Sequence, residues 1–395
     1  MRFVKLIALP AVATIFITSC IRSEAPNAEA DIISCEISPD SIVESVVVDN
    51  NSVLIRIKPD EDISALSPTF LITDGATISP ASGSVQDFLN ADSHTVYYTV
   101  TSEDGQWKKR YPVRISQNEI PSTYKFNSCR RDLENKQYYY DFYETDDNGE
   151  SLMKWATGNP GYNLCGVAVR DAMSKYGNES YIPHIYEFFP TVPIFTDESQ
   201  TTVDYIRLQT RSTGAFGSMM KMPIAAGNIF QGVFEMSLAV SNPRGATKFG
   251  ETYRYEPIRL SGKYRYKAGA TYTDGQGNVV SGKKDMFSIY ALFFETDENT
   301  EYIDGSIHDA NFKHPNLVSM AMLEDPHESS EWVSFDIEFK PVAGRTVDKE
   351  KLAKGKYKVG MVISSSVDGD YFKGAVGSTL DVKDLKYDNK QSTNE

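Results

Sequence analysis

The sequence predicts an all-β protein, in which an N-terminal immunoglobulin-like sandwich is followed by a larger jelly-roll β-sandwich. Short apolar runs with an alternating pattern recur along the chain, and turn residues separate them. Aromatic residues are abundant, with 23 Tyr and 20 Phe, and such side chains suit half-buried strands. No long amphipathic helices separate the runs, which argues against a parallel α/β fold.

Residues 1–19 are predicted to be a signal peptide, and Cys20 is the predicted lipidation site. A basic start precedes an apolar stretch over residues 6–17, which is shorter than the ~20 residues of a membrane-spanning helix. A cysteine directly after small residues at the end of such a stretch is the lipobox pattern of bacterial lipoproteins. Residues 20–31 are then a lipidated, polar tether. We expect an outer-membrane lipoprotein, on the cell surface or the periplasmic face, that contacts the membrane only through its anchor.

Charge and cysteine content exclude several classes of protein. The formal net charge of −14 argues against nucleic-acid partners and against attraction to anionic lipid. The cysteines beyond Cys20 are too few for a disulfide scaffold and too far apart in sequence for a zinc site. Pairing among Cys35, Cys129 and Cys165 is left open by the sequence.

Residues 32–117 are predicted to form the immunoglobulin-like domain. Turn signals such as Asp49-Asn50-Asn51 and Asp104-Gly105 separate its apolar runs. About seven short strands in roughly 85 residues are typical of such a sandwich. Clear strand patterns cover residues 53–57, 69–72, 95–100 and 109–115.

Residues 124–388 are predicted to form the jelly roll, after a linker at 118–123. Alternating patterns indicate strands with one buried face. Only residues 167–176 have a pattern compatible with a helix. The expected strands include residues 229–238, 288–294, 333–339 and 357–363.

The first domain resembles immunoglobulin-like modules found at the N-terminus of surface lipoproteins in glycan-utilisation systems. Residues 75–83, 97–105 and 109–113 carry this resemblance. It implies that the module is a spacer between the membrane and the second domain.

The second domain resembles the family named the putative carbohydrate metabolism domain. This resemblance implies a jelly roll and a role with carbohydrate, but it implies no reaction mechanism. An Asp-Asp pair that is usual before the last strand reads Lys383-Asp384 here, so a metal role for that pair is in doubt. The motifs that carry the resemblance are residues 155–161, 225–232, 257–266, 364–375 and 377–384.

Aromatic side chains are the candidate carbohydrate-binding residues, because flat rings stack on the apolar faces of sugars while neighbouring polar groups bind the hydroxyls. Some candidates lie in glycine-rich loops and others on strands, where an aromatic stripe is more often part of the core. Both readings stay open. The candidates are Trp155, Asn159, Tyr162, Tyr255, Tyr264, Tyr266, Tyr371 and Phe372.

A structural calcium ion is considered at Asp368 and Asp370, which flank Gly369 and offer oxygen ligands. The same Asp-Gly-Asp sequence is also an ordinary tight turn. No other cofactor is expected. No catalytic residue is assigned, because the chain lacks a Gly-x-Ser-x-Gly elbow, a phosphate-binding loop and a His-Glu-x-x-His motif.

The sequence therefore favours a surface-anchored lipoprotein that binds an oligo- or polysaccharide without catalysis, alongside other outer-membrane glycan-uptake components. One alternative is a glycoside hydrolase or a related carbohydrate-active enzyme, which would need two carboxylates ~5 Å or ~6.5–9.5 Å apart. Glu235 and Glu338 were considered for that role, but exposed strand positions explain them as well. Another alternative is an adhesin-like surface component that binds protein.

Overall fold

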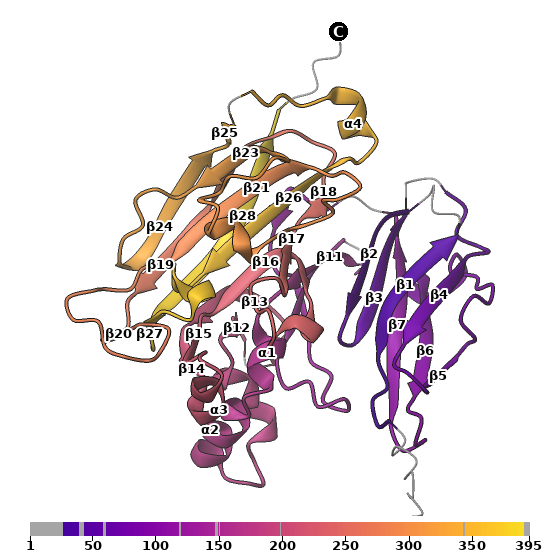
Figure 1. Cartoon of the computed structure of the whole chain (residues 1–395), viewed down its shortest axis with the longest axis horizontal. Coiled ribbons are helices and arrows are strands. Elements are labelled where there is room, and N and C mark those ends of the chain that lie inside the picture. The colour runs from indigo at the N-terminus through magenta and orange to yellow at the C-terminus, as the bar shows by residue number, and fades with distance from the viewer. Residues whose placement is uncertain are drawn as a thin grey trace, which may run out of the picture.

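The computed structural model describes residues 27–38, 43–57, 61–117, 120–146, 149, 151–197, 199–342 and 344–390 (Figure 1). The predicted signal peptide and Cys20 lie outside these residues. The described chain forms two successive β-sandwiches, so the predicted all-β fold class is confirmed. Among the described helices, none has the length and apolar character that crossing a membrane requires.

The N-terminal sandwich contains seven strands over residues 32–116, as predicted. One sheet has the order β2-β3-β7-β6-β5, and β1 pairs with β4 in a second sheet. Strands β3 and β7 run parallel, whereas the other pairs are antiparallel. The strands are β1 (Ile32–Ser38), β2 (Val43–Asp49), β3 (Ser52–Ile57), β4 (Ser67–Ile72), β5 (Thr77–Ser79), β6 (Thr95–Thr101) and β7 (Lys108–Ser116).

The second sandwich has a six-stranded sheet with the order β12-β13-β28-β19-β24, and β8 pairs with β28. All of its pairs are antiparallel. We call it the small sheet. Its strands are β8 (Thr123–Tyr124), β12 (Thr191–Phe195), β13 (Val203–Gln209), β19 (Pro257–Lys267), β24 (Ser329–Glu338) and β28 (Thr379–Asn389).

The opposing sheet, which we call the large sheet, has 11 strands, with the main order β25-β23-β21-β26-β16-β11-β10-β9. Of the short strands, β17 pairs with β16, β18 pairs with β26, and β22 pairs with β17. The strands are β9 (Ser128–Arg130), β10 (Asp141–Thr145), β11 (Ser151–Ala156), β16 (Asn228–Phe234), β17 (Thr247–Phe249), β18 (Glu251–Thr252), β21 (Ser288–Glu295), β22 (Ile303–Asp304), β23 (Leu317–Met322), β25 (Lys340–Pro341) and β26 (Tyr357–Ser364). The two-stranded pairs β14 (Arg211–Ser212) with β15 (Ile224–Ala225) and β20 (Tyr272–Thr273) with β27 (Gly374–Ala375) complete the fold.

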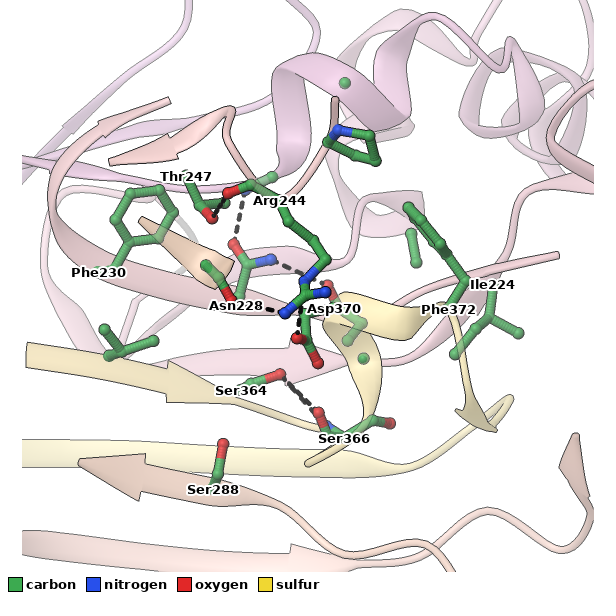
Figure 2. A pocket seen from close by; sticks show the side chains of 18 of the residues that line it. Ile224, Asn228, Phe230, Arg244, Thr247, Ser288, Ser364, Ser366, Asp370 and Phe372 are labelled. Atoms are coloured by element: carbon green, nitrogen blue, oxygen red, sulfur yellow. Dashed lines mark hydrogen bonds and ion pairs between the residues drawn. The ribbon is translucent and has the colours of Figure 1, made fainter. Parts of the chain in front are cut away.

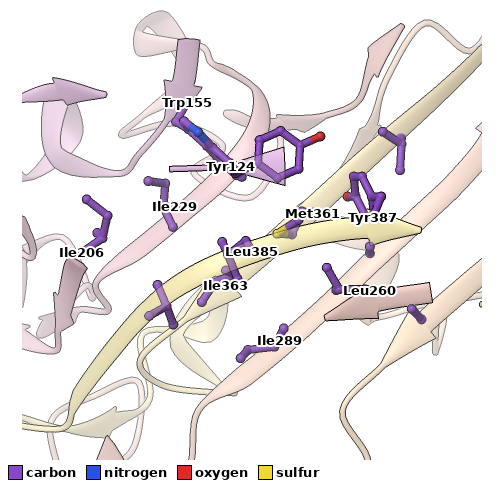
Figure 3. Packing of buried hydrophobic residues seen from close by; sticks show 14 of the residues in the cluster. Tyr124, Trp155, Ile206, Ile229, Leu260, Ile289, Met361, Ile363, Leu385 and Tyr387 are labelled. Carbon is purple, nitrogen blue, oxygen red and sulfur yellow. The ribbon is translucent and has the colours of Figure 1, made fainter. Parts of the chain in front are cut away.

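The main core lies between the large and small sheets (Figure 3). Because side chains alternate along a strand, Met361 and Ile363 of β26 face this core, whereas Val362 points to the opposite side. Leu260 and Leu385 of the small sheet oppose them. Strand β26 is buried on both faces, so further chain must cover the outer face of the large sheet.

Loops and short helices provide that cover. The predicted helix over residues 167–176 is confirmed as α2 (Val167–Tyr176). It packs with the 3-10 helix η3 (Ile182–Phe188) around the buried side chains of Ile185 and Phe189. The remaining short helices are α1 (Asn159–Asn163), α3 (Gly214–Met219), α4 (Lys349–Ala353), η2 (Asp92–His94), η4 (Met236–Leu238), η5 (Gly305–His308) and η6 (Gly369–Tyr371).

The two sandwiches meet in a polar junction. Lys154 of β11 pairs with Asp49 of the first sandwich and with Asp141, 3.0 Å away, and its ammonium group is buried. Arg56 and Glu251 form a second buried pair across the junction at 3.4 Å. These two pairs show that the N-terminal sandwich packs directly against the large sheet. A buried ion pair is stable only when both partners are present.

Candidate functional site

A cavity of about 520 Å³ lies on the outer face of the large sheet (Figure 2). Its floor is formed by Phe230 of β16, Tyr290 of β21 and Val362 of β26. These side chains belong to the outer-facing set of their strands, because alternate residues point into the main core. The sheet therefore supplies a rigid aromatic and aliphatic base.

Most of the cavity wall is apolar. Tyr162 of α1 and Phe249 of β17 line the sides, and Phe312 packs against Tyr290 with the ring centroids 5.1 Å apart. Exposed apolar side chains surround the mouth. They are Leu164, Phe216, Val240 and Val367.

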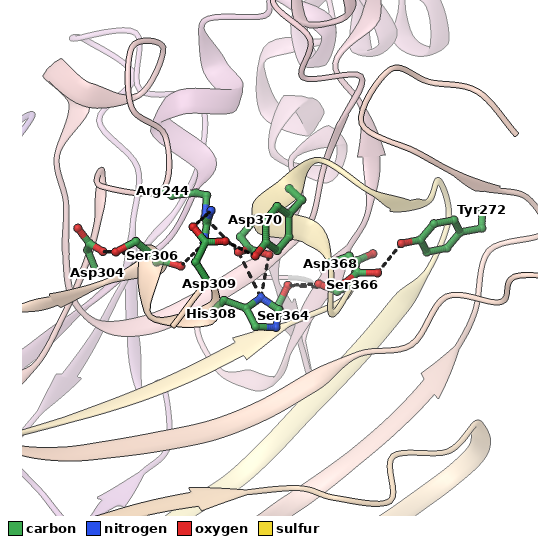
Figure 4. Close-up of polar contacts among 12 residues, drawn as sticks. Arg244, Tyr272, Asp304, Ser306, His308, Asp309, Ser364, Ser366, Asp368 and Asp370 are labelled. Carbon is green, nitrogen blue, oxygen red and sulfur yellow. Dashed lines mark hydrogen bonds and ion pairs between the residues drawn. The ribbon is translucent and has the colours of Figure 1, made fainter. Parts of the chain in front are cut away.

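The polar end of the cavity brings together Arg244, His308 and Asp370 (Figure 4). Nδ1 of His308 lies 3.2 and 3.3 Å from the two carboxylate oxygens of Asp370. A carboxylate only accepts hydrogen bonds, so this pair places a proton on Nδ1. The hydrogen bond with Asp370 raises the pKa of His308, while burial opposes the shift.

Arg244 is held from several sides. Its Nη1 lies 2.6 Å from Oδ2 of Asp309, and its Nη2 donates to the backbone oxygen of Gly305 at 3.2 Å. Its guanidinium lies 4.4 Å from the centre of the Tyr371 ring. The buried Nε is 3.3 Å from Asp370 but makes no hydrogen bond among the described residues. This N–H is therefore shielded from solvent beside the Asp370 carboxylate, and the guanidinium reaches the cavity through its other atoms.

The chain after β26 positions Asp370. Asp368 accepts hydrogen bonds from the hydroxyl of Tyr272 at 2.6 Å and from Lys283 at 2.7 Å, which fixes the start of the turn. A Cβ at Gly369 would lie 2.5 Å from the Cβ of Ala226, so glycine is required by close packing. Phe372 then adopts the left-handed conformation with φ 57°, which is uncommon for an aromatic residue and frequent at functional sites.

A buried carboxylate supports this turn from behind. Oδ2 of Asp285 accepts hydrogen bonds from Ser366 Oγ at 2.6 Å, from Ser378 Oγ at 2.7 Å and from the Ala375 backbone N–H at 2.7 Å. Burial raises the pKa of Asp285, although these hydrogen bonds oppose the shift. The network ties the segment that carries Asp370 to the last strand of the small sheet.

Four of the predicted carbohydrate-binding residues are buried away from the cavity, so the prediction that they are exposed contacts is wrong. Trp155 packs against Tyr124, and its Nε1 donates to Glu144 at 3.0 Å. Asn159 is fully buried and exchanges two hydrogen bonds with the backbone of Thr191. Tyr264 and Tyr266 point inward, because alternate side chains of their strand face the core. Both rings contact Phe287 there.

Other candidates lie at or near the cavity. Tyr162 and Phe372 line it, although the hydroxyl of Tyr162 is engaged with the backbone oxygen of Ser212. Tyr371 lies beside it, with its hydroxyl donating to Asp309. Tyr255 is exposed, packs on Tyr253 and does not line the cavity. Sugar binding by these tyrosines and by Phe372 stays a prediction.

Calcium binding at Asp368 and Asp370 stays a prediction. Lys283 binds the carboxylate of Asp368, whereas His308 and Arg244 approach that of Asp370. In the described ranges, no three His, Cys, Asp or Glu side chains gather as metal ligands would. Cys35, Cys129 and Cys165 are free thiols, and Cys165 lines the cavity.

Sequence reasoning missed Arg244, His308 and the aromatic floor. His308 and Arg244 stand alone in the sequence, without a spacing that indicates a site. Phe230 and Asp370, by contrast, fall within two of the motifs that carry the family resemblance. Membership of these motifs was the signal that the sequence offered for Phe230 and Asp370, and the structure shows that both line one cavity.

Comparisons with known proteins confirm the family that the sequence motifs predict. The model of the family described as "Putative carbohydrate metabolism domain" matches residues 125–387. The chain belongs to this family. A second model, described as "SGBP, N-terminal", the N-terminal domain of surface glycan-binding proteins, matches residues 32–115. The chain is accordingly carbohydrate-related, and its first domain is that of a cell-surface component.

Solved structures that are similar to this chain include two that are described as putative glycoside hydrolases. One, described as a putative glycoside hydrolase from Bacteroides thetaiotaomicron VPI-5482, shares 42% identity with a TM-score of 0.80, covering 94% of this chain and 100% of that one. The other, also described as a putative glycoside hydrolase, comes from Bacteroides vulgatus ATCC 8482. It shares 38% identity with a TM-score of 0.60, covering 69% of this chain and 100% of that one. A search of the curated proteins gives no match.

Proposed function

We propose that this protein is a surface glycan-binding lipoprotein, which is anchored to the outer membrane through Cys20 and holds a glycan segment in the cavity on the large sheet. The observation that carries the proposal is the polar cluster of Arg244, His308 and Asp370 at one end of an aromatic-lined cavity. The cavity volume of about 520 Å³ lies within the range of small-molecule sites, ~300–1,000 Å³.

The two parts of the cavity suit the two kinds of surface on a sugar. The rings of Tyr290, Phe312 and Phe372 offer flat apolar faces for C–H groups. The partly exposed guanidinium of Arg244 and carboxylate of Asp370 offer a charged donor and a charged acceptor for hydroxyl groups. Side-chain positions fixed by packing lower the entropy lost on binding.

A glycoside hydrolase is the second candidate, since both similar solved structures are described as putative glycoside hydrolases and two carboxylates, Glu324 and Asp370, line the cavity. The hydrogen bond from Lys340 lowers the pKa of Glu324. An ionised Glu324 suits a general base or nucleophile, so Asp370 would have to be the general acid. The carboxylate of Asp370 is instead engaged by His308 and Arg244. Binding without hydrolysis therefore remains the first proposal.

The test is affinity electrophoresis of the chain from residue 21 onward in gels that contain plant, host or microbial polysaccharides. We expect retardation by at least one neutral polysaccharide, with at least a tenfold loss of affinity for His308→Ala and Phe312→Ala. His184→Ala is the matched control, because His184 makes a similar pair with Glu187 at 3.1 Å outside the cavity. Equal retardation of His308→Ala and His184→Ala would contradict the proposal.

Incubation of the same polysaccharides with the protein separates binding from hydrolysis. The proposal expects no release of reducing ends or oligosaccharides. Product release that is lost in both Glu324→Gln and Asp370→Asn would establish the hydrolase instead. We also propose that the protein acts beside other outer-membrane components of glycan uptake, which co-purification from intact membranes would test.

A further inference from the structure

A second group of aromatic and charged side chains lies on the solvent face of the small sheet, away from the cavity. Tyr205 of β13 and Trp332 of β24 meet edge to face, with ring centroids 5.4 Å apart. Arg207 of β13, Lys383 of β28 and Arg265 of β19 surround these two rings. We call these five residues the cationic platform.

Strand register explains how residues distant in sequence form this platform. Strand β28 lies between β13 and β19, and Asp381 pairs in register with Arg207 on one side and with Arg265 on the other. Side chains at paired positions point to the same face of a sheet. Asp381 and Lys383 therefore project outward with the two arginines, whereas Leu380 and Val382 enter the core.

Asp381 fixes the orientation of both guanidinium groups. Its side chain is 4% exposed and accepts from Arg207 Nε and Nη2 at 2.8 and 3.0 Å and from Arg265 Nε at 2.7 Å. The hydroxyl of Tyr205 accepts from Nη2 of Arg265 at 2.8 Å and of Arg207 at 3.3 Å. Within the described chain, Nη1 of each arginine has no hydrogen-bond partner. Two oriented donor groups thus remain available at a partly exposed surface.

The charge of this surface differs from that of the protein. Arg207, Arg265 and Lys383 carry three positive charges, and the carboxylates that pair with them are Asp381 and Asp204, which lies 3.1 Å from Lys383. The platform and its two paired carboxylates together carry one net positive charge, whereas the whole chain has a formal net charge of −14. Guanidinium groups match carboxylate and sulfate geometry, and indole rings stack on sugar faces.

The geometry points to a second carbohydrate site, in which the cationic platform binds a sugar unit that bears an anionic group. The anionic group, a carboxylate or a sulfate, binds the free Nη1 groups of Arg207 and Arg265, while the sugar ring packs on Trp332. This site goes beyond the proposed cavity function and does not depend on it, because its residues come from the opposite sheet. A glycan with both neutral and acidic units then binds to two faces of one sandwich.

The test is affinity electrophoresis of the chain from residue 21 onward in gels containing polygalacturonate, dextran sulfate or neutral dextran. We expect retardation by polygalacturonate, dextran sulfate or both, and the two gels distinguish the carboxylate from the sulfate. Affinity should fall at least fivefold in both Arg265→Met and Trp332→Ala. Arg259→Met is the matched control, because Arg259 lies on the same strand, pairs with Asp336 and is roughly 20 Å from Arg265.

Each outcome decides the proposal. No retardation of the wild type by either acidic polymer overturns it, and so does unchanged retardation of Arg265→Met or Trp332→Ala. Thermal unfolding checks that the variants fold, and Lys383→Met replaces any variant that does not. His308→Ala should keep its binding to the acidic polymer, so that failure of the cavity proposal is distinguished from failure of this one.

Discussion

Nδ1 of His308 and Oδ1 of Asp370 lie 3.2 Å apart although 62 residues separate them in the sequence. The first residue ends the 3-10 helix η5, and the second belongs to η6, just after strand β26. Their contact brings a titratable ring and a carboxylate to the polar end of an otherwise apolar cavity. The account of glycan binding depends on this pair and on the neighbouring Arg244.

The His308–Asp370 pair predicts a pH dependence of stability. The pKa of His308 is raised in the folded protein, so the pair's contribution is fully present below the unfolded pKa of about 6.5 and is lost as pH rises through the folded value. The melting temperature of the wild type should exceed that of His308→Gln most at pH 5.5, and the difference should shrink by pH 8.5. A difference that grows with pH would contradict this assignment.

Trp155→Ala should destabilise the protein rather than weaken a sugar contact. The side chain is 1% exposed and packs between Tyr124 and Phe126, with ring centroids 5.2 Å away in each case. Loss of a buried Trp costs about 3–5 kcal/mol, and the partner Glu144 also loses a donor. Urea unfolding measures the loss. A variant of wild-type stability that no longer binds glycan would show that this ring is a binding surface after all.

Lys154→Met should weaken the junction between the two sandwiches. Burial lowers the pKa of Lys154, but Asp141 and Asp49 raise it by more, so the ammonium group stays charged. Its removal leaves two largely buried carboxylates without their cationic partner, which costs about 3–5 kcal/mol. Urea unfolding followed by tryptophan fluorescence reports the change. Lys175→Met, at an exposed pair, is the control and should behave like the wild type.

Asp285→Asn should loosen the turn that carries Asp370. One carboxylate oxygen accepts three hydrogen bonds and the other accepts the Met286 backbone N–H at 2.9 Å, and an amide cannot accept at both positions. The unsatisfied donor should cost about 1–3 kcal/mol and reduce glycan affinity as the turn shifts. Calorimetric unfolding and gel retardation measure these effects. Unchanged affinity would show that the cavity does not need this support.

Much of the fold followed from local patterns in the sequence. The number of strands in the first sandwich, the position of most of them and helix α2 were predictable, because turn residues and side-chain periodicity act over a few neighbouring residues. The shared face of Tyr264 and Tyr266 was also correctly predicted from their spacing. Periodicity does not show which face of a strand is buried. Here the face that carries both tyrosines is the one that packs into the core.

The candidate site was less predictable because long-range packing assembles it. Arg244, His308 and Asp370 lie on three separate segments, and only the folded sheet brings them together. Val362 illustrates the same limit, since its strand is apolar throughout and its outward direction depends on the register with β16 and β21. The glycine-rich motif around Asp370 indicated a loop that could carry function. Its partners Arg244 and His308 lie far away in the sequence and could not be predicted from the motif.

The central claim is that the aromatic cavity with Arg244, His308 and Asp370 binds glycan. Isothermal titration with the neutral polysaccharide that retards the wild-type protein, or an oligosaccharide derived from it, tests this claim most directly. The account predicts saturable binding that falls at least tenfold in His308→Ala and stays unchanged in His184→Ala and Arg259→Met. Equal affinity of His308→Ala and the wild type would contradict it.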